Sequence, residues 1–75
     1  MQEKDAFYLA ELPQTQYNVM MYLEKELAHG SKYIDYEKIG RSITPPRSRH
    51  AVAHAIDKLR LRRLIFIRDG RLSLI

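Results

Sequence analysis

The strongest constraint on the fold is the stretch of residues 44–60, where two adjacent prolines precede an amphipathic segment. Proline lacks a backbone N–H and clashes with a preceding helical turn, so Pro45 and Pro46 are excluded from a helix interior but are tolerated in a first turn. Either Thr44 or Ser48 can supply the N-cap oxygen that a helix start requires. The sequence leaves both starts open.

Apolar and polar side chains in this segment recur at helical spacing. The apolar stripe consists of Val52, Ala55, Ile56 and Leu59. At about 100° per residue, the opposite side carries Arg47, His50, His54 and Asp57. We therefore expect a helix over about residues 45–60 that buries one side and presents the other to a partner.

The end of the chain carries a second strong local signal, an Asp-Gly pair between two β-prone runs. Asp69-Gly70 is typical of a type I′ hairpin turn, because glycine adopts positive φ at little steric cost. The predicted hairpin over residues 64–75 then pairs Arg68 with Arg71, Ile67 with Leu72 and Ile65 with Leu74.

The two faces of this hairpin differ in chemistry. The face expected to cover the core consists of Ile65, Ile67, Leu72 and Leu74, and the other carries Phe66, Ser73, Arg68 and Arg71. Like charges directly opposite each other destabilise a pair of strands. Paired arginines at the hairpin tip therefore indicate a contact with phosphate; the alternative is that both side chains extend into water.

The first part of the chain predicts one long helix. Residues 14–29 form it, and Gly30 is placed to end it in a left-handed conformation. Its buried side consists of Tyr17, Val19, Met20, Leu23 and Leu27. Residues 1–12, before Pro13, are expected to form a short helix or an arm that docks on another subunit.

The middle of the chain predicts a short strand and a second helix. Residues 31–34 are β-prone and few, and Asp35 is placed to cap a helix over residues 36–42. Ile39 and Ile43 are expected to face inward from this helix. The order is then helix, strand, helix, turn, helix and hairpin, a mainly α domain with a C-terminal β-hairpin.

This order is that of a winged helix-turn-helix domain. Residues 39–41, residues 52–59 and Leu64-Ile65 together resemble the helix-turn-helix signature of bacterial and phage winged-helix regulators. The start of the first helix, residues 12–19, is similar to that of MarR-type repressors. The resemblance covers about residues 13–75 and implies the order α-β-α-α-β-β, a three-helix core plus a wing.

The sequence departs from this family pattern in three places. The segment between Ile43 and Val52 is longer than the usual turn. Arg63 stands where such families commonly place glycine before the first strand of the wing. The chain also lacks the long C-terminal dimerisation helix of MarR proteins.

The charge is divided between the two halves of the chain. Residues 1–40 hold four Lys and seven Asp or Glu, a net charge of −3, whereas residues 41–75 hold nine Lys or Arg and two Asp, a net charge of +7. A solvated surface is the simplest reading of scattered charge, but here the excess is confined to the third helix and the segment after it. A polyanion, most simply nucleic acid, is the expected partner.

By the resemblance, the third helix would enter the major groove of double-stranded DNA. Its candidate contacts are Arg47, Arg49, His50 and His54, because Arg reads guanine bidentately and His donates to a phosphate or a base edge. The residues suited to the DNA backbone are Arg41, Lys58, Arg60, Arg62 and Arg63. Arg68 and Arg71 would reach phosphate or the adjacent minor groove. Asp57 would repel phosphate unless it accepts from a cytosine or pairs with a nearby Arg.

Catalysis, cofactors and metals find little support in the sequence. The three glycines are isolated at positions 30, 40 and 70, so no loop cradles a phosphate. His50 and His54 have the spacing of two zinc ligands on one helix, but cysteine is absent and no third ligand is evident. We expect neither an enzyme nor a bound cofactor or metal.

The expected function is double-stranded DNA binding by a small transcriptional regulator. A phage or plasmid replication or recombination accessory factor would have the same features. The rival class is a winged helix used as a protein-interaction module, which exposed apolar side chains on the third helix would favour. A homodimer through residues 1–12 and the outer hairpin face, Phe66 included, would match a palindromic site.

The sequence also gives an expected location. Cysteine is absent, no apolar run is long enough to span a membrane, and the acidic start is not a signal peptide. A soluble cytoplasmic protein is expected, in a bacterium, an archaeon or a phage-infected cell.

Overall fold

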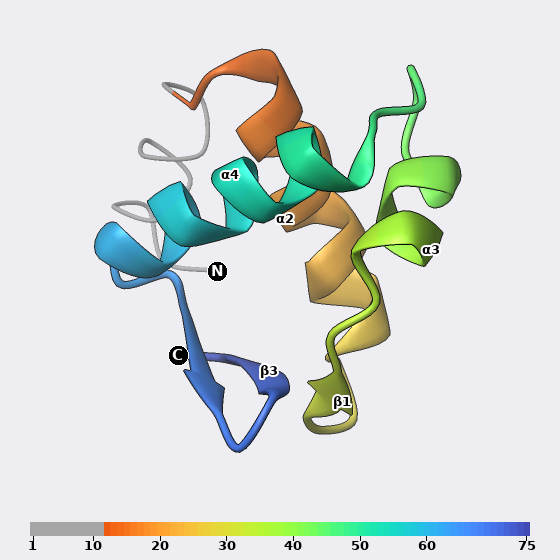
Figure 1. Cartoon of the computed structure of the whole chain (residues 1–75). Coiled ribbons are helices and arrows are strands. Elements are labelled where there is room, and N and C mark those ends of the chain that lie inside the picture. The colour runs from red at the N-terminus through yellow and green to blue at the C-terminus, as the bar shows by residue number, and fades with distance from the viewer. Residues whose placement is uncertain (1–11) are drawn as a thin grey trace.

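The computed structural model describes residues 12–75, and within them it has the predicted order of elements (Figure 1). The helices are α2 (Gln14–Glu26), α3 (Tyr36–Ser42) and α4 (Arg49–Leu61); the strands are β1 (Lys32–Tyr33), β2 (Ile65–Arg68) and β3 (Arg71–Leu74). This part of the chain is mainly helical with a small antiparallel sheet, as predicted. The arm or helix predicted over residues 1–12 lies outside the described residues, apart from Leu12.

The core forms where α4 packs against α2, α3 and β2. All four residues of the predicted α4 stripe are buried, and Val52 and Leu59 are fully enclosed. The core side chains are Leu12, Val19, Met20, Leu23, Leu27, Ile39, Ile43, Val52, Ala55, Ile56, Leu59, Ile65 and Leu72. Tyr17 was expected on the buried side of α2 but is 37% exposed and is not part of the core.

The start of α4 is settled by its cap. Ser48 has extended backbone angles, and its Oγ accepts a hydrogen bond from the Ala51 N–H at 3.2 Å. Of the two starts that the sequence left open, the one capped by Ser48 is confirmed, and the start near residue 45 is wrong. Pro45 and Pro46 lie in the loop before the helix rather than in its first turn. This is the capping arrangement in which a hydroxyl satisfies an N–H that has no helical partner.

The other two helices differ in how well their ends were predicted. The cap of α3 is as expected, because Asp35 accepts from the Lys38 N–H at 3.1 Å. The end of α2 at Glu26 comes earlier than the predicted His29. Residues 27–30 instead form a turn in which the Gly30 N–H donates to the Leu27 carbonyl at 3.3 Å. Gly30 has φ +135°, a positive value but not that of a left-handed helical cap.

The sheet has the order β1-β3-β2, and all neighbours are antiparallel. The predicted hairpin register is confirmed throughout, and Asp69 (φ +53°) and Gly70 (φ +75°) both have the positive φ of a type I′ turn. The short strand β1 pairs with β3, placing Lys32 opposite Leu72 and Tyr33 opposite Arg71.

The inner face of the hairpin is only partly buried. Ile65 and Leu72 are buried and Leu74 packs against the core, as predicted. Ile67 was expected to cover the core as well, but it is 36% exposed. Ile67 lies in the edge strand β2, directly opposite the buried Leu72 of the central strand β3, so at this level the core covers the centre of the sheet but not its edge.

The end of α4 is a Schellman motif with an arginine in the position that normally holds glycine. The Leu64 N–H donates to the Leu59 carbonyl at 3.2 Å, and the Arg63 N–H donates to the Arg60 carbonyl at 3.0 Å. Arg63 has φ +61°, in the left-handed region. Arg63 is therefore a strained residue at the exit from the helix.

We predict that Arg63→Gly stabilises the fold. Glycine removes the Cβ contact that makes left-handed angles costly, a gain of about 1 kcal/mol in the free energy of unfolding. Urea titration followed by circular dichroism would measure it. Arg62→Gly is the matched control. Arg62 has φ −81°, an ordinary value for any residue, so glycine relieves no strain there and should lower the free energy of unfolding. Equal destabilisation by both changes would contradict the prediction.

Candidate nucleic-acid interface

The outer face of α4 is the side turned away from the buried stripe. Three of the residues predicted there, His50, His54 and Asp57, are exposed. Ala53 lies at the edge of this face and is half-buried. Leu61 continues the row at the C-terminal end of the helix and is 65% exposed. The face is thus polar and small along most of its length and apolar at one end.

Arg47 does not belong to this face by helical periodicity, contrary to the prediction. It lies in the loop of residues 43–48 that joins α3 to α4, and its side chain is exposed there. Its backbone N–H donates to the Gly40 carbonyl at 3.0 Å, which fixes the loop against α3. The Asn18 side chain donates to the Thr44 carbonyl at 3.1 Å and holds the same loop against α2.

The close approach of α3 to the start of α4 depends on Gly40. It is buried in α3, and a Cβ built on it would collide with the backbone carbonyl of Arg47 and touch the side chain of Val52. Only glycine leaves room for this contact, so Gly40 and the Arg47 backbone together set how α4 leaves α3.

Two basic side chains of α4 are paired with carboxylates. Arg60 contacts Asp57 one turn away, with 2.7 Å between the guanidinium nitrogen and the carboxylate oxygen. The Arg49 guanidinium lies 3.9 Å from the Glu37 carboxylate of α3, measured from Nη1 to Oε1. Of the two alternatives for Asp57, the pairing with a nearby Arg is present, so the one acid on the outer face is offset by its neighbour. Pairs this exposed contribute little to stability.

The other predicted cations of the helical part are exposed. They are Arg41 on α3, Arg47 in the loop, Lys58 on α4, and Arg62 and Arg63 at the exit from α4. Among residues 12–75, no carboxylate lies within ion-pair distance of any of them. Positive charge therefore remains uncompensated by the described residues before α4 and after it.

The two arginines of the hairpin tip have different surroundings. Arg68 is exposed, and no carboxylate of the described residues pairs with it. Arg71 donates from Nε to the Ser31 hydroxyl at 3.0 Å and from Nη2 to the Ser31 carbonyl at 3.1 Å. Its guanidinium also lies 4.7 Å from the centre of the Tyr33 ring. Arg71 is thus held against β1, which relieves its repulsion from Arg68 across the strand pair.

The strand β1 is anchored to α2 as well. Lys32 donates to Glu26 with 2.8 Å between Nζ and Oε2. This hydrogen bond, helped by the charge of Lys32, lowers the pKa of the Glu26 carboxyl and raises the pKa of the Lys32 ammonium. The position of Tyr33 is therefore fixed by the Lys32 contact before it and, after it, by the Ile34 N–H, which donates to the Gly70 carbonyl at 3.2 Å.

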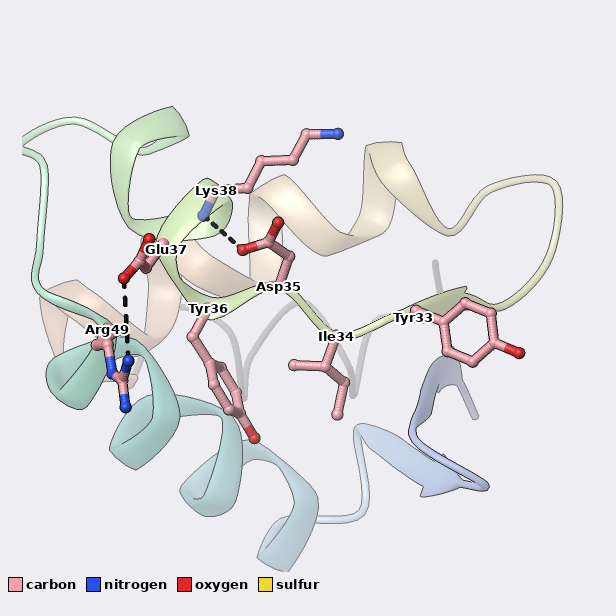
Figure 2. Close-up of a pocket in the computed structure, with 7 residues that line it drawn as sticks. All are labelled: Tyr33, Ile34, Asp35, Tyr36, Glu37, Lys38 and Arg49. Atoms are coloured by element: carbon pink, nitrogen blue, oxygen red, sulfur yellow. Dashed lines mark hydrogen bonds and ion pairs between the residues drawn. The ribbon is translucent and has the colours of Figure 1, made fainter.

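An open groove of about 570 Å³ lies between β1, the start of α3 and the start of α4 (Figure 2). Ile34 and Tyr36 point into it, and Arg49 closes one end beside Glu37. The charged lining residues are Asp35, Glu37, Lys38 and Arg49, two acids and two bases. This balance does not favour a phosphate in the groove, so the candidate anion contacts lie on the outer face of α4, beside its ends and on the hairpin.

Comparison with known proteins adds no further guide to the site. No protein-family model matches the chain, and neither a curated protein nor a solved structure is similar enough to count as a match. The described residues include no group of three or more His, Asp or Glu that could hold a metal ion, and no helix among them is long and apolar enough to cross a membrane.

Tyr33 is the main site feature that the sequence did not reveal. The β-prone character of residues 31–34 predicted a strand, but nothing local said which strand it would join. Pairing with β3 brings Tyr33 beside Arg71, although 38 positions separate them in the chain. An alternating pattern longer than two residues would have been needed to predict this contact.

We predict that Gly40→Ala destabilises the fold by about 2–3 kcal/mol, because the added methyl meets a backbone carbonyl that cannot move without shifting α4. Unfolding in urea would measure the loss. Gly70→Ala is the control: nothing lies near its added Cβ, so only the cost of φ +75°, about 1 kcal/mol, is expected. Where no such contact exists, replacing a helical glycine with alanine raises stability. A higher free energy of unfolding for Gly40→Ala would therefore contradict the close approach of Gly40 to the Arg47 carbonyl.

Proposed function

We propose that this chain is a winged helix-turn-helix protein that binds double-stranded DNA in the regulation of transcription. In this proposal α3 and α4 form the helix-turn-helix, α4 enters the major groove, and the β2–β3 hairpin is the wing. The observation that carries the proposal is the outer face of α4, on which His50, His54 and the small Ala53 lie between uncompensated cations at the two ends of the helix.

The arrangement of elements supports this reading. The helix α4 buries one full side against α2, α3 and β2, which leaves the opposite side for a partner. A helix fits the major groove of B-form DNA, where each base pair presents a distinct pattern of donors and acceptors. Histidine can donate to those edges, and a small alanine can approach a thymine methyl group.

The cations would divide between base reading and positioning. Arg47 lies in the loop just before α4 and Arg49 is the first residue of the helix, and both could reach guanine or the adjacent backbone. Arg41, Lys58, Arg62 and Arg63 would contact phosphates. Arg68 would act at the wing tip, and Arg71 would join it only by releasing Ser31.

One observation favours the rival function, a protein-interaction module. Leu61 is 65% exposed at the end of the outer face of α4, where DNA would provide few contacts for an apolar side chain. It is a single residue beside Lys58 and Arg62, so a protein partner for this surface would have to be acidic around a small apolar contact. DNA remains the better match to the face as a whole.

We predict salt-sensitive binding of a fluorescent random-sequence duplex. If about five phosphates are neutralised, log K falls with log[salt] at a slope near −4.5. Arg47→Ala/Arg49→Ala removes two cations, so binding should weaken and the slope should become shallower by about 1.8. Fluorescence anisotropy at several salt concentrations would measure both quantities.

The matched control for this test is Lys25→Ala/Lys38→Ala. It lowers the net charge by the same amount, but Lys25 lies near the end of α2 and Lys38 points away from α4 (Figure 2). We expect it to leave the slope nearly unchanged. An equal effect of the two double changes on the slope would mean that binding depends only on the total charge of the protein. A slope near zero for the unaltered protein would overturn the DNA proposal.

A further inference from the structure

The outer sheet face is the side of the three-stranded sheet that does not cover the core. Side chains alternate along a strand, so the burial of Ile65 and Leu72 assigns their neighbours to the opposite side. The register places Phe66 opposite Ser73, Arg68 opposite Arg71, and Tyr33 opposite Arg71. We use the name outer sheet face for Tyr33, Phe66, Arg68, Arg71 and Ser73.

Two aromatic rings on this face are exposed. Tyr33 is 71% exposed and Phe66 is 43% exposed. Figure 2 shows the Tyr33 ring pointing away from Ile34 and Tyr36, at one end of the groove that all three residues line. Because burial of an aromatic side chain is strongly favourable, rings left in solvent on one face indicate a surface that a partner covers.

The charge of this face limits the kind of partner. Arg68 and Arg71 lie on it, and none of the residues of β1, β2 and β3 is acidic. A partner that is both aromatic and anionic would satisfy the rings and the guanidinium groups together. A single strand of nucleic acid has this chemistry, since its unpaired bases stack on aromatic rings and its phosphates attract arginine.

The contacts around Arg71 prepare the face for such a ligand. Ser31 holds the guanidinium by two hydrogen bonds, and the guanidinium in turn lies over the Tyr33 ring. One side of the ring is supported while the side chain stays largely exposed, so little ordering is required when a base stacks on it. Arg71 lies in the central strand β3, between Tyr33 on β1 and Phe66 on β2.

The separation of the two rings suits several nucleotides rather than one. Tyr33 and Phe66 lie two strands apart and two residues out of register, which places their backbones about 12 Å from each other. A strand of DNA crossing the sheet would meet one ring, then Arg71, then the other ring. Arg68 at the hairpin tip would join this path to the duplex.

We infer that the outer sheet face is a second nucleic-acid site, which binds single-stranded DNA by stacking bases on Tyr33 and Phe66. The choice of DNA over RNA rests on the proposed function, because the hairpin tip is shared with the proposed duplex surface. The protein would then hold an unpaired strand beside a duplex, as at a fork or an opened site.

The test uses the full chain, a fluorescent oligothymidylate of about 15 nucleotides, and a fluorescent duplex, each titrated by anisotropy. Tyr33→Ala/Phe66→Ala should weaken binding of the oligothymidylate at least about tenfold and change duplex binding less than about twofold. Tyr33→Phe/Phe66→Tyr keeps both rings and should bind as the unaltered chain does. Tyr17→Ala removes an exposed tyrosine of α2 and serves as the surface control.

Cross-linking of the oligothymidylate to the unaltered protein by ultraviolet light gives a readout that needs no variant. Mass spectrometry should place the cross-links on Tyr33 or Phe66. Cross-links confined to α4 would overturn the inference, as would no oligothymidylate binding at low salt, or alanine changes that leave it intact or weaken both probes equally.

Two further outcomes have separate meanings. A dimer in sedimentation that the alanine changes dissolve, without oligothymidylate binding, would overturn the inference and assign the face to a second copy of the chain. Oligothymidylate binding that the alanine changes abolish, without any duplex binding, would support the inference while the proposed function fails.

Discussion

Burial of one side of α4 is the interaction on which the rest of the structure depends. Val52, Ile56 and Leu59 are almost fully enclosed in the core, where α4 packs against α2, α3 and β2. In a chain of 75 residues such a core buries only about 60–65% of the unfolded surface, so no second core is available to replace it. Because the stripe fixes the rotation of α4 about its axis, it also decides that His50 and His54 face outward.

The direction of α4 is set at its two ends by the backbone rather than by the stripe. At the start, Gly40 allows the Arg47 carbonyl to approach α3, and Ser48 caps the first turn. At the end, the Schellman motif turns the chain into β2, at the cost of left-handed angles at Arg63. A side chain at Gly40 would shift the whole outer face, whereas the strain at Arg63 is local and leaves an arginine at the exit from the helix.

The sequence predicts what is encoded by neighbouring residues and misses what depends on distant ones. The α4 stripe, the Asp35 cap and the hairpin register come from local spacing and turn chemistry, and all three are confirmed. Thr44 and Ser48 were equivalent as caps in sequence; the loop contacts to Gly40 and Asn18 leave Thr44 before the helix. Ile67 fits the alternation of an inner face, but it lies on the edge strand β2, and at this level the core covers only its partner Leu72 in the central strand. The pairing of Tyr33 with Arg71 is a tertiary contact, which a strand of two residues is too short to predict.

The division of basic residues between two surfaces follows from these constraints. On α4, cations lie beside a polar helix face, which suits a ligand read from a groove. On the sheet, Arg71 is committed to Ser31 and to the Tyr33 ring, which suits a ligand that presents flat bases. The hairpin tip belongs to both proposed surfaces, so Arg68 can serve either one. With both proposals, the same fold would bind a duplex through α4 and an unpaired strand through its sheet. The geometry of the hairpin tip would then select DNA in which a duplex adjoins an unpaired strand.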